Sequence, residues 1–320
     1  MMTILVTGAT GFIGSWVVRS LMKRRMEAVL TDVRRDFSRL SMLVEDPESI
    51  PFVESDITQA DAFEKIFREY DVDRVIHLAA LQIPQCRADP LKGGHVNVIG
   101  FLRLFEAVKK FGGVKNVVYA SSAAVYGPPT LYGPGPVGEK VVLQPATHYG
   151  AFKVCNELTA NAYWAENRIP SIGLRPHTVY GFGRDVGVTA DVTKALKAAL
   201  LSKPFKIRFG GMIAMQYAAD VAEAFVASSL AGLDGARVYN LRGEVVDMSL
   251  VVETIHNLVP GSEKLITYDP TPLPLAGDLD DTAFRREVGP LPTTPIREGL
   301  TETLQIFKRL KEEGLLTLEE

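Results

Sequence analysis

The feature that most constrains the fold is a glycine-rich turn that directly follows an apolar segment near the start of the chain. Ile4–Thr7 is predicted to be a strand, and the turn leads into a predicted helix, Ile13–Arg24. Glycines at positions 8, 11 and 14 permit tight turning and let backbone N–H groups approach a pyrophosphate at the positive end of a helix. Because glycine turns also join strands to helices without any ligand, this pattern needs a second signal.

That signal is an acidic residue about 20 residues downstream. Asp32 ends the next predicted strand, where a carboxylate would bond the hydroxyls of the adenosine ribose; the alternative is a turn or cap residue. A carboxylate in this place repels a 2′-phosphate, so NAD is favoured over NADP. Arg34 and Arg35 follow directly and keep NADP open, because guanidinium groups can hold a phosphate.

Short apolar segments alternate with longer segments that carry apolar residues at helical spacing. The short segments show no two-residue alternation, which is typical of a parallel sheet covered on both faces. The pattern predicts an α/β fold with a Rossmann-type doubly wound parallel sheet. The predicted strands are Ile4–Thr7, Ala28–Asp32, Phe52–Val53, Arg74–Leu78, Val117–Ala120 and Ile172–Arg175, and the predicted helices are Ile13–Arg24, Asp61–Tyr70, Val98–Phe111 and His148–Asn167.

Proline and glycine mark the less regular parts of the chain. Gly127–Gly138 is predicted to be a long loop beside the site. After Arg175 the predicted strands and helices alternate less regularly, and prolines separate shorter elements. We therefore predict an NAD-binding domain over residues 1–175 and a smaller, mainly substrate-binding C-terminal lobe over residues 176–320, with some segments of the lobe returning to the core.

A candidate proton-transfer pair lies in the predicted helix His148–Asn167. Tyr149 and Lys153 are four residues apart and share one helix face. Lowering a tyrosine pKa from ~10 to neutrality requires roughly 4 kcal/mol, which a cation at about 4 Å supplies, so we expect Lys153 to do this. This spacing is common by chance, but Ser122 follows a predicted strand at the edge where the ligand crevice forms, and we expect it to hold the substrate oxygen.

Together these motifs resemble the extended short-chain dehydrogenase/reductase family, also called the NAD-dependent epimerase/dehydratase family, over nearly the whole chain. Its landmarks here are the glycine turn, Asp32, Asp56-Ile57, His77-Leu78-Ala79-Ala80, Asn97 with Gly100, Ser121-Ser122 before Val125-Tyr126-Gly127, Tyr149 with Lys153, and Asp220-Val221-Ala222.

The resemblance implies which residues meet the cofactor. Asp56 and Ile57 would flank the adenine, Lys153 would also bond the nicotinamide ribose, and Asn97 would brace the fourth helix. The full expected set is Gly8, Gly11, Phe12, Ile13, Gly14, Asp32, Asp56, Ile57, Leu78, Ala79, Ala80, Asn97, Tyr149 and Lys153. The expected chemistry is a hydride moving between the nicotinamide and a carbinol carbon, while Tyr149 exchanges the hydroxyl proton and Ser122 orients it.

The departures from the family pattern bear on the substrate. Ala123-Ala124 stand where the dehydratase branch has an Asp-Glu pair, which disfavours dehydration. Thr178 and Ile213 stand where nucleotide-sugar epimerases have an asparagine and an arginine that hold the diphosphate. We therefore expect a smaller substrate, namely a sugar, sugar acid or related hydroxy compound. The expected substrate contacts are Gln82, Ser122, His177 and Thr178. Arg184 and Lys206 are alternatives for the missing charge, but the favoured interpretation of both is a solvated side chain without that role.

Three functions remain open at this stage. An NAD-dependent dehydrogenase acting on a secondary alcohol is slightly favoured, because the diphosphate contacts are missing. The alternative is a sugar or nucleotide-sugar epimerase that retains its cofactor. The remote alternative is an NAD-binding regulator without turnover, which the intact Ser122, Tyr149 and Lys153 disfavour.

Composition limits the partners and the location. The formal net charge of −3 argues against nucleic acid, and no apolar run approaches the roughly 20 residues of a membrane helix. Two cysteines, Cys86 and Cys155, lie in different predicted elements and indicate neither a disulfide framework nor a metal site, so we expect a cytoplasmic protein. His77, His148 and His177 have no ligand spacing, and we expect no metal. The family resemblance implies a homodimer through the helices Val98–Phe111 and His148–Asn167.

Overall fold

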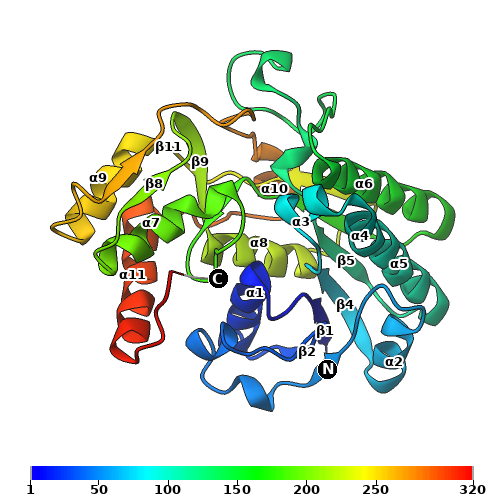
Figure 1. Cartoon of the computed structure of the whole chain (residues 1–320). Helices are drawn as coiled ribbons and strands as arrows, with labels where there is room; N and C mark the ends of the chain where they lie inside the picture. The colour runs from blue at the N-terminus through cyan, green and yellow to red at the C-terminus, as the bar shows by residue number, and fades with distance from the viewer. Residues whose placement is uncertain (1, 319–320) are drawn as a thin grey trace.

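A seven-stranded parallel sheet forms the centre of the computed structural model, which describes residues 2–318 (Figure 1). The strand order is β10-β6-β5-β4-β1-β2-β3, so the chain runs outward in both directions from the β1–β4 pair. This reversal opens a crevice at the carboxyl ends of the strands. The α/β fold with a Rossmann-type parallel sheet is confirmed. Its strands are β1 (Thr3–Thr7), β2 (Glu27–Asp32), β3 (Phe52–Glu54), β4 (Val72–His77), β5 (Asn116–Ala120), β6 (Ser171–Arg175) and β10 (Ala236–Asn240).

Both faces of this sheet are covered by helices, as the unbroken apolar strands require. In β1, Ile4 and Val6 belong to one buried cluster and Leu5 to another, because successive side chains point to opposite faces. The helices α1 (Phe12–Lys23) and α8 (Ala218–Leu230) pack on the first face. The second face is covered by α2 (Ala62–Glu69), α5 (Gly100–Phe111) and α6 (His148–Asn167).

The six predicted strands all form, with ends within two residues of the predicted ones, and β10 is a seventh strand that the prediction missed. The predicted helix Val98–Phe111 starts later, at Gly100. Before it, the chain forms α3 (Ile83–Ala88), α4 (Pro90–Gly94) and a π-helical turn, His95–Ile99. Short 3-10 turns occur at Leu40–Met42, Pro47–Ser49, Ala123–Val125, Pro129–Leu131 and Val188–Ala190.

The C-terminal part of the chain forms two small sheets beside the main one (Figure 1). One has the order β11-β9-β7 and the other pairs β12 with β8. Since β10 and α8 pack into the main sheet and its helix layer, the chain returns to the core after leaving it. The predicted division at residue 175 stays a prediction, and its outer bounds, residues 1 and 319–320, lie outside the described residues. The remaining elements are β7 (Thr178–Tyr180), α7 (Asp191–Leu200), β8 (Phe205–Ile207), β9 (Met212–Tyr217), β11 (Glu244–Asp247), α9 (Met248–Leu258), β12 (Ile266–Tyr268), α10 (Thr282–Glu287) and α11 (Ile296–Glu312).

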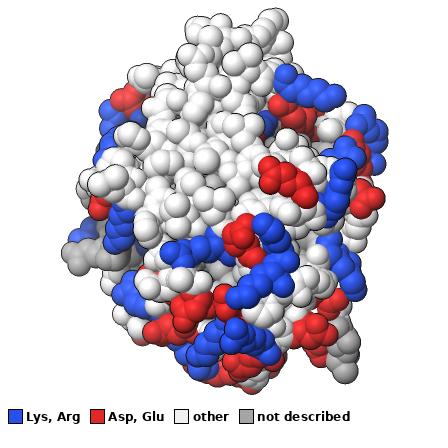
Figure 2. All heavy atoms as spheres, turned by 90° about the vertical axis from the view of Figure 1, so that its right-hand side faces the viewer, with Lys and Arg blue, Asp and Glu red and all other residues white. Residues whose placement is uncertain are grey.

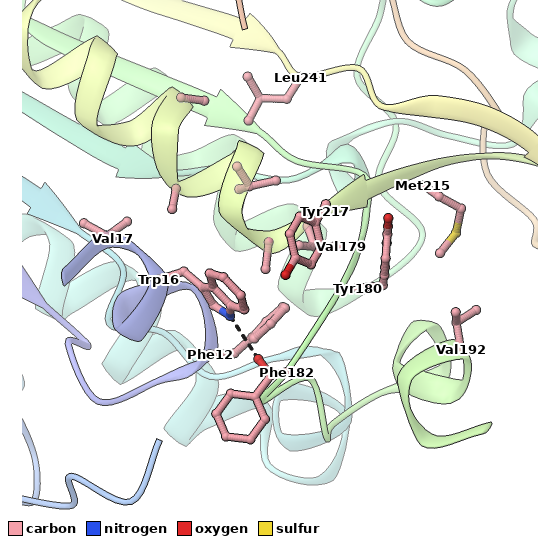
Figure 3. Close-up of a cluster of buried hydrophobic side chains, with 14 of the residues drawn as sticks. Phe12, Trp16, Val17, Val179, Tyr180, Phe182, Val192, Met215, Tyr217 and Leu241 are labelled. Atoms are coloured by element: carbon pink, nitrogen blue, oxygen red, sulfur yellow. Dashed lines mark hydrogen bonds between the residues drawn. The ribbon is translucent and has the colours of Figure 1, made fainter. Parts of the chain in front are cut away.

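An aromatic cluster joins α1 to the C-terminal part (Figure 3). The Trp16 indole N–H donates to the Phe182 carbonyl oxygen at 3.0 Å, and the Trp16 ring meets Tyr217 edge-on at a centroid distance of 5.3 Å. Buried aromatic pairs of this kind contribute about 0.5–1.5 kcal/mol beyond their buried area. The segment after β7 is therefore held against the helix that follows the glycine turn.

Candidate active site

The glycine turn has the shape that a pyrophosphate needs. Gly8 has a φ of +65°, and a Cβ there would lie 2.7 Å from the backbone nitrogen of Ala79. A Cβ at Gly14 would lie 2.1 Å from the Gly8 carbonyl oxygen. The helix α1 begins at Phe12 with no side-chain cap and no acidic residue in its first turn, so N–H groups at its positive end remain for an anion. The turn fits the pyrophosphate of a dinucleotide.

Asp32 lies at the end of β2 beside this turn. Its Oδ2 accepts hydrogen bonds from the backbone nitrogen and Oγ1 of Thr10, at 3.1 and 2.7 Å, and its Oδ1 accepts from the Val33 nitrogen at 2.8 Å. The carboxylate therefore braces the turn while it stays half-buried at the crevice edge. Arg35, one of the two arginines that kept NADP open, pairs with Glu48 at 2.6 Å.

Asp56 and Ile57 follow β3, at the expected adenine end. The Asp56 Oδ1 accepts from the nitrogen and Oγ1 of Thr58, at 2.9 and 2.8 Å. Burial opposes ionisation of this carboxyl, but these bonds outweigh burial and lower the pKa of Asp56. The Ile57 side chain is buried against Gly100, where an added Cβ would lie 2.7 Å from Ile57 Cδ1. Only the Ile57 backbone is left for the expected adenine contact.

The Asn97 side chain braces the loop after β4, and its backbone oxygen accepts from Asn156 Nδ2 of α6 at 2.9 Å. Asn97 is buried in the π-helical turn, where its Oδ1 accepts from the Leu81 nitrogen at 2.7 Å and its Nδ2 donates to the Leu81 oxygen at 2.9 Å. This loop carries Leu78, Ala79 and Ala80. The Asn97 side chain thus supports the expected cofactor loop, and its own hydrogen bonds are directed to the protein.

Ser122, Tyr149 and Lys153 lie together at the end of β5. The Ser122 Oγ caps the following 3-10 turn by accepting from the Ala124 nitrogen at 3.1 Å, and the Ser122 side chain also acts on the Tyr149 phenol, whose pKa it lowers. The Lys153 Nζ lies 5.4 Å from the centroid of the Tyr149 ring and donates to the Ala120 carbonyl oxygen at 2.6 Å. The structure therefore joins the three predicted catalytic residues.

The charges around Tyr149 differ from the prediction. Burial raises the pKa of Tyr149, and the Ser122 hydrogen bond and the charge of Arg184 oppose that rise. Burial also lowers the pKa of Lys153, to about 8. The expectation that Lys153 supplies the charge that lowers the Tyr149 pKa is thus corrected: the Lys153 ammonium is held by Ala120, and Arg184 is the cation that acts on the phenol.

A buried ion pair that sequence reasoning missed supports this site. Arg175, at the end of β6, donates from Nε and Nη2 to the two carboxylate oxygens of Glu157 in α6, at 2.8 and 2.6 Å. The side chains are only 4% and 6% exposed. Glu157 also accepts from the Ser121 hydroxyl, and Arg175 Nη1 donates to the Tyr126 hydroxyl at 2.7 Å. The only sequence signal is a charged residue ending an otherwise apolar strand.

The expected substrate residues receive unequal support. The two ring nitrogens of His177 bond the Thr178 Oγ1 at 3.1 Å and the Ala276 oxygen at 2.5 Å, and Thr178 is buried. Geometry therefore supports a packing role for His177 and Thr178. Gln82 is half-buried at the crevice, and its Oε1 accepts from Arg184 Nη1 at 2.9 Å. Gln82 and Arg184 are thus joined by a hydrogen bond between the cofactor loop and the segment after β7.

The histidine at the end of β4 is part of the packing beneath the cofactor loop. His77 is buried and its Nδ1 lies 2.8 Å from the Thr7 Oγ1. Burial, aided by the charge of Lys153, lowers the pKa of His77 to about 3. Within residues 2–318, no three His, Cys, Asp or Glu side chains gather in a way that could hold a metal ion.

The fold and the site define a class, namely enzymes that bind a dinucleotide on a parallel sheet and carry a tyrosine–lysine pair beside it. The model of the NAD dependent epimerase/dehydratase family matches residues 4–241, and the chain belongs to this family. A UDP-glucose 4-epimerase from Mycolicibacterium smegmatis is 32% identical over 319 residues, which cover 96% of this chain and 99% of that protein.

Two solved structures share the whole fold. The UDP-glucose 4-epimerase of Thermus thermophilus, in complex with NAD, is 27% identical with a TM-score of 0.81, and the match covers 96% of this chain and 99% of that one. A UDP-N-acetylglucosamine 4-epimerase from Methanobrevibacter ruminantium, in complex with UDP-N-acetylmuramic acid, is 25% identical with a TM-score of 0.84, covering 96% and 98%.

The family predicted from the motifs is therefore confirmed, and the protein is an NAD-dependent enzyme of the extended short-chain dehydrogenase/reductase type. Its cofactor is NAD, as predicted. The names of these relatives agree better with the alternative activity, a cofactor-retaining epimerase, than with the slightly favoured dehydrogenase.

Proposed function

We propose that this enzyme is a cofactor-retaining epimerase that inverts a secondary alcohol of a sugar. The observation that carries this proposal is the joined set of Ser122, Tyr149 and Lys153 at the end of β5, in a chain whose relatives are named as sugar epimerases. Such a set serves oxidation and reduction of the same carbon equally well, because acid and base are one residue in two protonation states.

Each residue has a defined part in the reaction. Tyr149 takes the proton of the substrate hydroxyl and later returns it. Ser122 orients that hydroxyl, since its side chain acts on the same phenol. The charge of Arg184 favours the phenolate when the proton has moved. When NAD is bound, its nicotinamide supplies the hydride acceptor and, once reduced, the donor.

Contacts across the expected cofactor crevice support retention of NAD. The segment Phe182–Asp185, which follows β7, lies over the start of α1 through the Trp16 hydrogen bond to Phe182 (Figure 3). From the loop after β2, Arg39 bonds Asp185 at 3.1 Å. The segment Phe182–Asp185 is thereby bonded both to α1 and to the loop after β2. These bonds would slow release of the dinucleotide between the two half-reactions.

Isotope retention tests the epimerase assignment. A sugar deuterated at the inverted carbon should keep its label through interconversion, because the hydride returns to the same carbon, and NADH absorbance should not accumulate. Mass spectrometry of small molecules released from the purified protein should find NAD. Accumulation of free NADH with conversion of the sugar to a stable carbonyl compound would instead establish a dehydrogenase.

We further propose that the sugar carries no nucleotide diphosphate. Ile213 is buried in β9, and Thr178 is buried with its hydroxyl bonded to His177, so neither offers a charge to a diphosphate. Calorimetry with UDP-glucose on the NAD-loaded protein should show no micromolar binding. A micromolar dissociation constant would overturn this part of the proposal and leave the epimerase assignment intact.

A homodimer is proposed from the face formed by α4, α5 and α6. Figure 2 shows a broad uncharged area on this face, with charged side chains at its margins. Leu91 of α4 is 88% exposed and Leu158 of α6 is 66% exposed, which is unusual for leucines unless a partner covers them. Sedimentation should give twice the chain mass for the native protein and the single-chain mass for Leu158→Glu. Native protein sedimenting as single chains would contradict the dimer.

A reducing compartment such as the cytoplasm is also proposed, since Cys86 and Cys155 are both free. Among the described residues, none of the helices combines the length and apolar character needed to cross a membrane.

A further inference from the structure

Arg184, in the segment after β7, is a cation whose hydrogen bonds within residues 2–318 all go to neutral oxygens. Its Nη1 donates to Gln82 Oε1 at 2.9 Å, its Nη2 donates to Thr189 Oγ1 at 2.8 Å, and its Nε is buried without a hydrogen-bond partner among residues 2–318. The neighbouring carboxylate, Asp185, bonds Arg39 and Lys197 instead. Burying a guanidinium without a bonded anion costs free energy, and an anionic ligand bonded to Arg184 would offset that cost.

The other cations of the C-terminal lobe behave differently. Arg208 and Arg242 each make two bonds to one carboxylate, Asp191 and Asp278, at 2.7 to 2.8 Å. Lys206, which the sequence offered as a replacement charge, pairs with Asp269 at 3.4 Å and is largely exposed. Arg184 therefore differs from them in having no hydrogen-bonded carboxylate within residues 2–318 and in offering an unpaired Nε–H to a ligand; Asp185 acts on it through its charge alone.

The position of Arg184 places such a ligand beside the reacting atoms. Its charge acts on Tyr149, and its guanidinium carbon lies 5.6 Å from the ring centroid of Phe12, at the start of α1. Gln82 directly precedes α3 at the end of the expected cofactor loop. The guanidinium thus lies between the start of α1 and the end of the expected cofactor loop, within electrostatic reach of Tyr149.

We propose that Arg184, Gln82 and Thr189 form an oxyanion-binding site beside Tyr149, and that a carboxylate of the substrate occupies it. The Nε–H and a remaining N–H of the adjacent Nη form the edge that a carboxylate meets with two parallel hydrogen bonds. The substrate is then a sugar acid whose carboxylate lies close to the inverted carbinol. This inference rests on the proposed function, because it takes Tyr149 as the group that contacts that carbinol. The pyrophosphate of NAD is the other oxyanion that could reach Arg184.

Binding of two matched probes to the NAD-loaded protein tests the proposal. By calorimetry, glucuronate should bind at least about tenfold tighter than glucose, the worth of a charge-assisted hydrogen bond. Arg184→Gln should abolish this preference, and Arg184→Lys should keep part of it, because a point charge cannot form the bidentate pair. Arg242→Gln, which breaks an exposed pair, is the matched control and should keep the full preference.

Three outcomes would overturn the inference. One is equal binding of the two sugars, or binding of neither at millimolar concentration. A second is an unchanged preference in folded Arg184→Gln. A third is loss of NAD from Arg184→Gln with the glucuronate preference intact in NAD-saturated samples, which would assign the site to the pyrophosphate. Failure of the proposed function is separate: Tyr149→Phe would then leave turnover unchanged while the Arg184-dependent preference persists.

Discussion

The buried pair Arg175–Glu157 gives the sharpest stability prediction. The two side chains share two hydrogen bonds of 2.8 and 2.6 Å and are almost entirely shielded from water. Burial disfavours the charge of Arg175, but the bonds to Glu157 outweigh burial and raise the pKa of Arg175. Glu157→Gln therefore leaves a guanidinium that can neither lose its proton nor reach solvent.

Removing one partner of a buried ion pair costs about 3–5 kcal/mol. That is a large fraction of the roughly 5–15 kcal/mol by which native proteins exceed the unfolded state. We expect Glu157→Gln and Arg175→Met each to lose about this much. The double variant Glu157→Gln/Arg175→Met should lose much less than the sum, because no charge is left buried. The Tyr126 hydroxyl loses the Arg175 donor in that variant but keeps its bond to Asn240.

Urea unfolding at one fixed protein concentration, followed by circular dichroism, measures these differences. Glu48→Gln is the matched control, since it breaks the exposed Arg35–Glu48 pair and should change stability by less than about 1 kcal/mol. Additivity of the two single-variant losses to within about 0.5 kcal/mol would refute the reasoning, because it would mean that the two charges do not interact. A Glu157→Gln variant as stable as the control would refute it equally.

Three further predictions concern the cofactor, the catalytic tyrosine and acid stability. Gly14→Ala should abolish NAD binding, measured by calorimetry, because its Cβ would lie 2.1 Å from the Gly8 oxygen, whereas Gly133→Ala, with no atom within 4 Å of its Cβ, should bind NAD normally. Tyr149→Phe should lower turnover by about 10²–10⁴-fold with NAD still bound, and an unchanged rate in an isotope-exchange assay would remove Tyr149 from catalysis. Because the pKa of His77 is about 3 in the folded chain and ordinary when unfolded, the unfolded state binds the extra proton as pH falls below about 6.5, so stability is lost toward acid. Between pH 7 and 5 the free energy of unfolding should fall by about 2 kcal/mol in urea titrations. In His77→Gln the free energy of unfolding should fall less over the same pH range, and an equal fall in that variant would contradict the assignment.

Local sequence patterns predicted much of the fold. The turn from Gly8 to Gly14 and the apolar strands predicted the parallel sheet, because backbone sterics and side-chain period act over a few residues. The strand β10 escaped prediction, since Ala236–Asn240 has mixed composition and becomes a strand by pairing with β6. The helix Val98–Phe111 was placed correctly except at its start, where a π-helical turn holds Asn97 against Leu81.

By itself, the sequence determined the fold class and, through the resemblance that its motifs carry, the family. It also proposed Ser122, Tyr149 and Lys153 as the catalytic set, because each of these motifs is a short segment of the chain. Only the tertiary structure decided how the charges are arranged around Tyr149. Lys153 bonds Ala120, Glu157 neutralises Arg175, and Arg184 bonds Gln82 and Thr189. Electrostatic effects depend on distance and burial, which segments far apart in sequence set only when they pack together.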